Sequence, residues 1–197
     1  MSSLETSRIP SIYPELLKIT EDVGFSMPSD VSFGNLLQTL IASKPNGIFL
    51  ELGTGTGLSL AWILQGMQLN SKVISLDNDD KLVQLVENTF KDERRLELLC
   101  IDGGEWVSSY EGDGFDLVFA DTWAGKYTHL EKTLEMVKEG GYYIIDDMNP
   151  QPNWPEGHGE KAKELVETLE QREDFILTKL DWSTGIIIAV KKSKYGK

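Results

Sequence analysis

Aspartates that follow short apolar runs are the residues most able to carry chemistry in this sequence. Asp77, Asp102, Asp121 and Asp146 each end such a run, and Glu51 lies just before a glycine-rich turn. If the runs are parallel strands, these carboxylates gather at one edge of a sheet, where open α/β sheets form their ligand crevice. Carboxylates placed there can accept hydrogen bonds from hydroxyl groups, bind a cation or act as a general base.

Further reactive side chains follow Asp146. A second carboxylate, Asp147, comes next, and the loop behind it carries Trp154 and His158. Because two adjacent unpaired carboxylates are costly in a core, the segment could form a metal site, a base or a substrate cradle, or it could simply end a strand. His158 is either catalytic or a solvated loop histidine. Trp154 and Trp123 are expected to wall an aromatic ligand, although each could instead pack over the sheet edge.

A glycine-rich turn follows the first apolar run. The alternating glycines of "ELGTGTGLS" (residues 51–59) let backbone N–H groups approach a ligand, because no Cβ obstructs them. The dinucleotide-binding pattern G-x-G-x-x-G would need one more glycine, but Leu58 and Leu60 stand at the two places where it could fall. This spacing argues against a pyrophosphate ligand. Asp77, at the next strand end, is placed to bind ribose hydroxyls or to cap the following helix.

Strand-like and helical segments alternate along the chain. The apolar runs expected as parallel strands are 47–53, 72–77, 96–102, 115–121 and 142–147. Helical spacing is found around 36–41, 82–89, 130–137 and 162–169, with "EGG" at 139–141 ending the third of these helices. Near the end, "FILTKLDW" and "GIIIAVKKS" are spaced as an antiparallel hairpin. This order predicts an open α/β sheet with helices on both faces.

Length and charge narrow the classes of function. The chain of 197 residues is expected to form one domain, with residues 1–45 as a helical N-terminal cap region and 46–197 as the α/β core. A net charge of −13 argues against a nucleic-acid partner. We expect a cytoplasmic protein without a membrane partner, because the sequence shows neither a spanning apolar run nor a signal peptide. The single cysteine, Cys100, is expected to be a buried strand thiol.

Together these motifs resemble one known family. "FLELGTGTGLS", "VISLD", "CIDGG", "FDLVFAD" and "KYTHLEKTLEMVKEGGYYIIDD" are similar to motifs of class I S-adenosylmethionine-dependent methyltransferases. Within that class they resemble the small-molecule O-methyltransferases related to the catechol and caffeoyl-CoA enzymes. The resemblance covers about residues 36–192. It implies a Rossmann-like, seven-stranded and mostly parallel sheet with an antiparallel strand from the C-terminal hairpin, and O-methylation of a small aromatic or hydroxylated acceptor.

The resemblance also implies which residues bind S-adenosyl-L-methionine. They are Glu51, Gly53, Thr54, Gly55, Ser59, Asp77, Asn78, Asp102, Gly103, Asp121 and Trp123. Among them, Asp77 would bind the ribose hydroxyls and Asp102 would approach the adenine. Asp121 would lie beneath the sulfonium, where a carboxylate suits the positive charge.

Metal-dependent members of the family bind Mg²⁺ at positions matched here by Asp121, Asp146 and Asp147, the last of which replaces an asparagine. The family's catalytic lysine falls at Ala124, so Lys126 is the candidate that could swing in. The catalytic candidates are therefore Asp121, Lys126, Asp146 and His158.

Two other functions stay open on the sequence alone. One is a protein that binds S-adenosylmethionine without turnover, and the other is an NAD(P)-dependent oxidoreductase on a related sheet. The expected partner is a small-molecule acceptor, with no nucleic acid and no membrane, and a homodimer is compatible with the chain.

Overall fold

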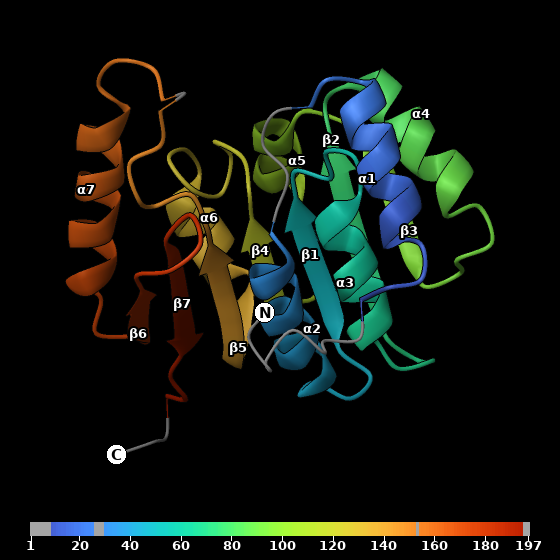
Figure 1. Cartoon of the computed structure of the whole chain (residues 1–197). Helices are drawn as coiled ribbons and strands as arrows, with labels where there is room; N and C mark the ends of the chain where they lie inside the picture. Colours follow the sequence, from blue (N-terminus) through green and yellow to red (C-terminus); the bar gives the residue numbers. More distant parts are fainter. Residues whose placement is uncertain (1–8, 26–29, 153, 195–197) are drawn as a thin grey trace, which may run out of the picture.

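A central sheet with helices on both faces organises the molecule (Figure 1). We describe it from a computed structural model, in which residues 9–25, 30–152 and 154–194 are described. The strands are β1 (Ile48–Leu52), β2 (Lys72–Asp77), β3 (Leu96–Cys100), β4 (Phe115–Ala120), β5 (Val137–Ile145), β6 (Phe175–Leu180) and β7 (Ile186–Lys191). The helices are α1 (Tyr13–Asp22), α2 (Val31–Ala42), α3 (Leu58–Gly66), α4 (Asp80–Thr89), α5 (Gly103–Ser109), α6 (Leu130–Glu135) and α7 (His158–Glu170). None of these described helices is long and apolar enough to cross a membrane.

The seven strands have the order β3-β2-β1-β4-β5-β7-β6. Pairs from β3 to β5 are parallel, whereas β7 is antiparallel to both β5 and β6. This confirms the predicted mostly parallel sheet and its C-terminal hairpin. The chain leaves β1 towards β2 on one side and returns to β4 on the other, so the order reverses between β1 and β4. Such a switch point is where open α/β sheets bind ligands at the carboxyl ends of their strands.

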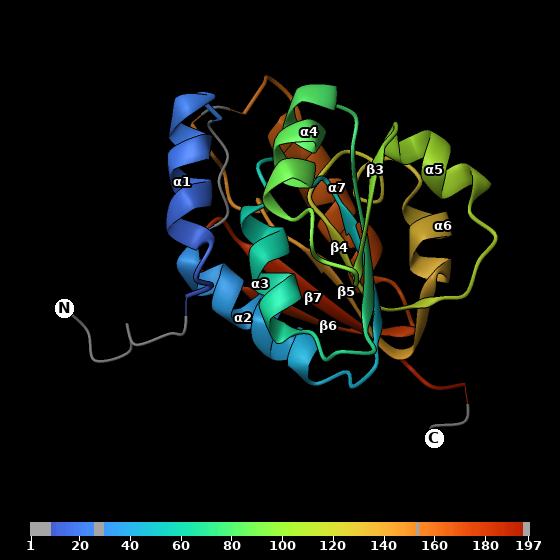
Figure 2. The same cartoon turned by 90° about the vertical axis from the view of Figure 1, so that its right-hand side faces the viewer.

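Alternating side chains divide the core into two layers. On one face, Phe49 and Phe119 pack with apolar residues of α2, α3 and α4. On the other face, Leu50 and Val118 pack with residues of α5, α6 and α7. Successive strand residues point to opposite faces, which is why near-continuous apolar runs are needed to fill both layers. Figure 2 shows the two groups of helices on either side of the sheet.

The N-terminal helices are tied to this core in different ways. α2 buries Phe33 and Leu37 in the same core layer as Phe49 and Phe119. α1 packs instead on α3, where Tyr13 contacts Trp62 edge-on with ring centroids 5.6 Å apart. α1 thereby lies next to the helix that follows the glycine-rich turn.

Three expectations about these elements were wrong. The helix expected over 130–137 ends at Glu135, and Val137 already belongs to β5, where it pairs with Phe115 before a register shift. Val137 is buried, so its fit to the helical spacing came from an inward-facing strand residue. Cys100 is exposed, because β3 lies at an edge of the sheet. His158, expected within a loop, is the first residue of α7.

The packing of α2 on α3 yields a test of stability. A Cβ added at Gly34 would lie 2.3 Å from Nε1 of Trp62, whose side chain is fully buried and cannot give way. We expect Gly34→Ala to lower the free energy of unfolding by about 1–3 kcal/mol through overpacking, measured by urea denaturation. The matched control is Gly159→Ala in α7, where the nearest atom to a new Cβ is 3.9 Å away. The free energy of unfolding of that variant should equal the wild-type value. An equal decrease in both variants would contradict the packing described.

Candidate active site

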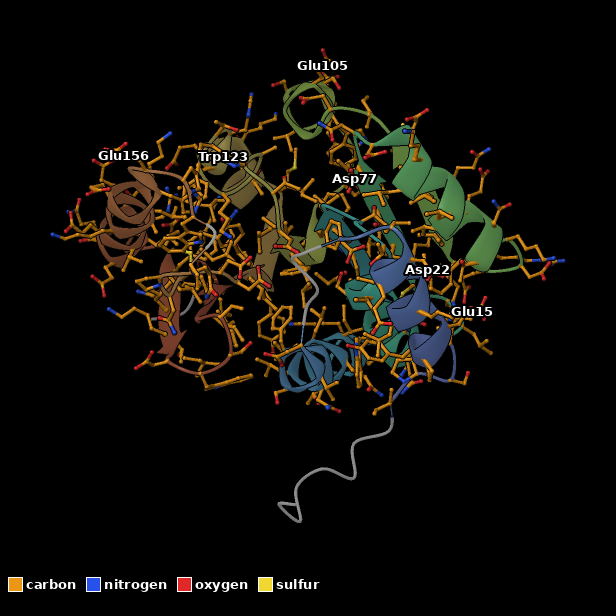
Figure 3. All side chains as sticks on the ribbon, turned by 45° about the horizontal axis from the view of Figure 1, so that its top comes forward. Glu15, Asp22, Asp77, Glu105, Trp123 and Glu156 are labelled. Atoms are coloured by element: carbon orange, nitrogen blue, oxygen red, sulfur yellow. The ribbon has the colours of Figure 1, made fainter. Side chains whose placement is uncertain are left out.

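The carboxyl ends of the parallel strands open into three adjoining cavities. Thr122, the second residue after β4, lines all three. The central cavity contains the glycine-rich turn together with Ser59 and Asp77. The β2-side cavity extends from Asp77 to Asp102, and the β5-side cavity extends from Asp121 to His158. Figure 3 looks towards this edge of the sheet and places Trp123 between Asp77 and Glu156.

The glycine-rich turn requires its glycines. Gly53 has φ +102°, and a Cβ there would lie 2.5 Å from the side chain of Thr122. Gly55 has φ +52°, a conformation that residues with a Cβ rarely adopt. Thr54 connects the turn to β2, because its hydroxyl lies 2.6 Å from the hydroxyl of Ser75 in that strand. The turn therefore presents bare backbone to the central cavity.

Asp77 holds this turn from the end of β2. Its Oδ2 accepts a hydrogen bond of 2.8 Å from the Gly55 N–H, and its Oδ1 accepts one of 3.0 Å from the Asp79 N–H. Asp79, and not Asp77, caps α4, because it accepts the N–H groups of Lys81 and Leu82. Each oxygen of Asp77 can accept a further hydrogen bond, and the residue lines both the central and the β2-side cavities.

Four residues that the sequence predicts to bind the cofactor lie together in the β2-side cavity, and one of them also caps a helix. Asn78, Asp102, Gly103 and Trp123 all line the β2-side cavity. Asp102 also caps α5, since it accepts the Glu105 N–H at 2.9 Å. Its helix-capping function is thus compatible with a position at the cavity wall.

Glu51 lies beneath the turn and does not line any of the three cavities. Its side chain is fully buried, Oε2 accepts a hydrogen bond of 2.5 Å from the Ser75 hydroxyl, and Oε1 has no hydrogen-bond partner. Burial raises the pKa of Glu51 to about 7. The residue is therefore a buried support of the turn, and not the direct wall that the sequence suggested.

Three carboxylates converge at the ends of β4 and β5. Asp121, Asp146 and Asp147 each offer an oxygen, and these oxygens lie within 4.8 Å of one another. Asp146 is buried, and its Oδ1 has no hydrogen-bond partner. Burial and the neighbouring Asp146 hold the pKa of Asp121 well above its ordinary value, and burial also raises the pKa of Asp146. Bringing a cation between them would relieve the repulsion.

Lys126 lies near enough to this cluster to act on its charges, whereas Ala124 lines a different cavity. Lys126 is 4% exposed and lines the β5-side cavity. Its positive charge favours the ionised forms of Asp121 and Asp146, acting to lower the pKa of each. Ala124 lines the β2-side cavity, and its Cβ lies 2.9 Å from where a Cβ of Gly103 would be. The sharp turn at Gly125, with φ +82°, sends the two side chains to different cavities.

Aromatic rings form the outer wall of the β5-side cavity. Trp123, Tyr127 and Trp154 surround His158, with ring centroids 5.7, 5.1 and 4.5 Å from that of the imidazole. The Tyr127 hydroxyl lies 3.1 Å from Nε2 of His158. Partial burial, with the charges of Lys126 and Lys161, lowers the pKa of His158, so its neutral form is favoured at neutral pH. Burial raises the pKa of Tyr127 to about 12, which keeps its hydroxyl protonated.

One wall residue, Phe25, and the threonine that anchors the helix before it were not predicted from the sequence. Phe25, just after α1, lines the central and β5-side cavities, and its ring would lie 3.2 Å from a Cβ at Gly55. Thr20 fixes this end of α1, because its hydroxyl lies 2.7 Å from that of Thr56 in the glycine-rich turn. No local pattern marks these contacts, since they join residues 30 and 36 positions apart.

Comparisons with known proteins agree with this geometry. Residues 50–148 match a family described as a methyltransferase domain. Two proteins from Mycobacterium leprae, strains Br4923 and TN, whose names assign them provisionally as O-methyltransferases, are 27% identical over 92 residues. That match covers 45% of this chain and 41% of each relative, so it spans less than half the length of those proteins.

Solved structures share the fold over nearly the whole chain. A Corynebacterium glutamicum protein superposes with a TM-score of 0.84 at 18% identity, covering 98% of this chain and 94% of that one. An O-methyltransferase from Bacillus cereus, in complex with SAH, superposes with a TM-score of 0.78 at 19% identity, covering 92% and 91%. At these identities the likeness establishes the fold, which is that of Rossmann-like methyltransferases.

The buried carboxyl of Glu51 generates a pH-dependent prediction. Its pKa of about 7 exceeds the ordinary 4.5, so between these values the unfolded chain releases a proton that the folded chain keeps. Stability is therefore lost as the pH rises through this window. Glu51→Gln cannot ionise, and at pH 8 it should unfold with a free energy about 3 kcal/mol higher than the wild type, with no gain at pH 4.

Urea denaturation at both pH values measures this difference. Glu97→Gln, the same substitution at an exposed position of β3, serves as the control and should show no such pH dependence. A loss of stability in Glu51→Gln that is equal at both pH values would refute the raised pKa.

Proposed function

This chain belongs to the methyltransferase-domain family, and on that premise we propose that it transfers a methyl group from S-adenosylmethionine to a hydroxyl oxygen of a small aromatic acceptor. The observation that carries the proposal is the shared wall of the central and β5-side cavities at Asp121 and Thr122. The cavity that would bind the nucleoside and an aromatic pocket with basic and acidic groups meet there. In-line transfer between two bound molecules needs such an arrangement.

The residues that line the central and β2-side cavities support binding of the cofactor there. The glycine-rich turn presents backbone N–H groups, and Asp77 keeps acceptor capacity for two ribose hydroxyls. Asn78, Asp102 and Gly103 would surround the adenine in the β2-side cavity. S-adenosylmethionine supplies a methyl group on a sulfonium, and transfer breaks its C–S bond, leaves the electron pair on sulfur, forms a C–O bond and releases the hydroxyl proton.

Residues of the β5-side cavity would prepare the acceptor. Its aromatic ring would lie against Trp123 and Trp154, with the reacting hydroxyl towards Asp121. Lys126 would stabilise the oxygen as it loses its proton, because a nearby positive charge favours the ionised form of the hydroxyl. Neutral His158 would take up this proton through its imidazole and pass it to solvent.

The carboxylate cluster fits a hard divalent cation. Asp121, Asp146 and Asp147 supply oxygen ligands, and the unpartnered Oδ1 of Asp146 is an acceptor without a donor. With all three carboxylates ionised, they and Lys126 together carry −2, the charge that Mg²⁺ would balance. When bound, Mg²⁺ would lower the pKa of a coordinated hydroxyl. We therefore propose Mg²⁺ at this cluster, with Asp147 in the place of the family's asparagine.

Cofactor binding is tested by calorimetry with S-adenosylhomocysteine. Asp77→Asn removes the charge but keeps the shape, and hydrogen bonds to a charged group contribute about 1.5–3 kcal/mol each. We expect binding to weaken at least about tenfold. Asp80→Asn makes the same change at an exposed residue outside the central cavity and should bind as the wild type does. Binding of NADH without any response to S-adenosylhomocysteine would instead favour an oxidoreductase.

Metal binding is tested without turnover, by thermal unfolding with and without Mg²⁺. Wild-type protein should gain about 1.4 kcal/mol when Mg²⁺ exceeds its dissociation constant tenfold. Asp146→Asn should be more stable than the wild type in EDTA, because it removes a buried repulsive charge, and should lose the response to Mg²⁺. A response to Mg²⁺ that persists in Asp146→Asn, or wild-type stability and activity both indifferent to EDTA, would exclude this site.

A further inference from the structure

We infer that the acceptor is a hydroxylated aromatic acid and that Lys161 binds its carboxylate. The inference rests on the proposed function, because it specifies the substrate that the β5-side cavity accepts. It starts from an adjacent hollow, the outer cavity, which the methyl-transfer proposal does not use. The outer cavity lies between the turn after β4 and helix α7, and Lys161 and Leu165 form its α7 side.

The outer cavity continues the β5-side cavity. Trp123, Lys126 and Tyr127 line both of them. Trp123 is 47% exposed, so part of its indole is available to an aromatic ligand. A ring against this indole, with its hydroxyl towards Asp121, would direct a substituent on its far side to the outer cavity. The acceptor would therefore span both hollows.

Lys161 makes the outer end of this path positive, and the buried Lys126 lies between it and the carboxylates. In a chain of net charge −13, Lys126 and Lys161 face the same cavity. Among the described residues neither has a carboxylate oxygen within 4 Å, whereas Lys138 and Lys163 both have such a partner. Glu164 also lines the cavity, and it lies three residues beyond Lys161 without forming an ion pair with it. The charge of Lys161 is thus not neutralised by a contact.

Lys161 is held in a way that leaves it ready to bind an anion. Its Nζ lies 4.4 Å from the centroid of the Trp123 ring, and its side chain is exposed. A cation–π contact of an exposed lysine is weak, worth about 0.5–1 kcal/mol. The ammonium can therefore turn from the ring to a carboxylate without breaking an ion pair. The opposite end of the path carries Asp121 and Asp147, which would repel that carboxylate and so orient the acceptor.

Matched acceptors test this assignment. The probes are 3,4-dihydroxybenzoate and its methyl ester, which differ in the carboxylate charge and keep the same ring hydroxyls. In the wild type we expect a kcat/KM about 3- to 5-fold higher for the acid than for the ester, and a loss of about the same size for the acid alone in Lys161→Gln, as expected for an exposed charge pair. Lys161→Arg should retain the preference. Lys163→Gln, on the same helix and 78% exposed, should leave both values unchanged.

Binding separates this inference from the proposed function. Calorimetry with each probe, on protein saturated with S-adenosylhomocysteine, should give tighter binding of the acid and a selective loss in Lys161→Gln. Equal affinity for acid and ester, an equal loss for both in Lys161→Gln, or no binding of the acid would overturn the inference. None of these results would alter the response of the wild type and Asp77→Asn to S-adenosylhomocysteine, on which the proposed cofactor depends.

Discussion

The mutual repulsion of three carboxylates at the ends of β4 and β5 is the constraint on which the rest of the site depends. β4 and β5 pair in parallel with Ala120 opposite Ile145, so the next residue of each strand, Asp121 and Asp146, must lie side by side. Parallel pairing thus brings the charges together, and burial intensifies their interaction because little water screens it. The cluster can be relieved only by a proton, by Lys126 or by a bound cation. Each of these carries positive charge, which is also what stabilises an oxygen that loses its proton.

The neighbouring turn adapts to this constraint. Gly125 takes a left-handed conformation, and its carbonyl accepts a hydrogen bond of 2.6 Å from the buried Tyr143 hydroxyl in β5. Held in this way, the turn brings Lys126 inwards and leaves Trp123 outside. The result is a pocket whose inner end is acidic around one buried lysine and whose outer end carries Lys161. Charge is therefore distributed along the same path as the proposed acceptor.

The sequence could predict features that depend on neighbouring residues, but not contacts between residues far apart in the chain. The positions of Asp77, Asp121 and Asp146 followed from local strand patterns, because a strand end is visible in the residues that form it. The contact of Phe25 with the glycine-rich turn was not predictable, since it depends on how α1 packs on α3. The inward direction of Lys126 depends on one backbone angle at Gly125. Glu51 was correctly placed near the turn, but only the packed structure shows that it lies below it.

Transfer of a labelled methyl group tests the central claim most directly. Protein incubated with S-adenosylmethionine carrying a deuterated methyl group, Mg²⁺ and a mixture of hydroxylated aromatic compounds should yield a product in which mass spectrometry finds the label on a ring oxygen. The same reaction with Asp121→Asn should form that product more slowly. Label found only on nitrogen or carbon, or no labelled product although S-adenosylhomocysteine binds, would contradict an O-methyltransferase that uses this carboxylate cluster.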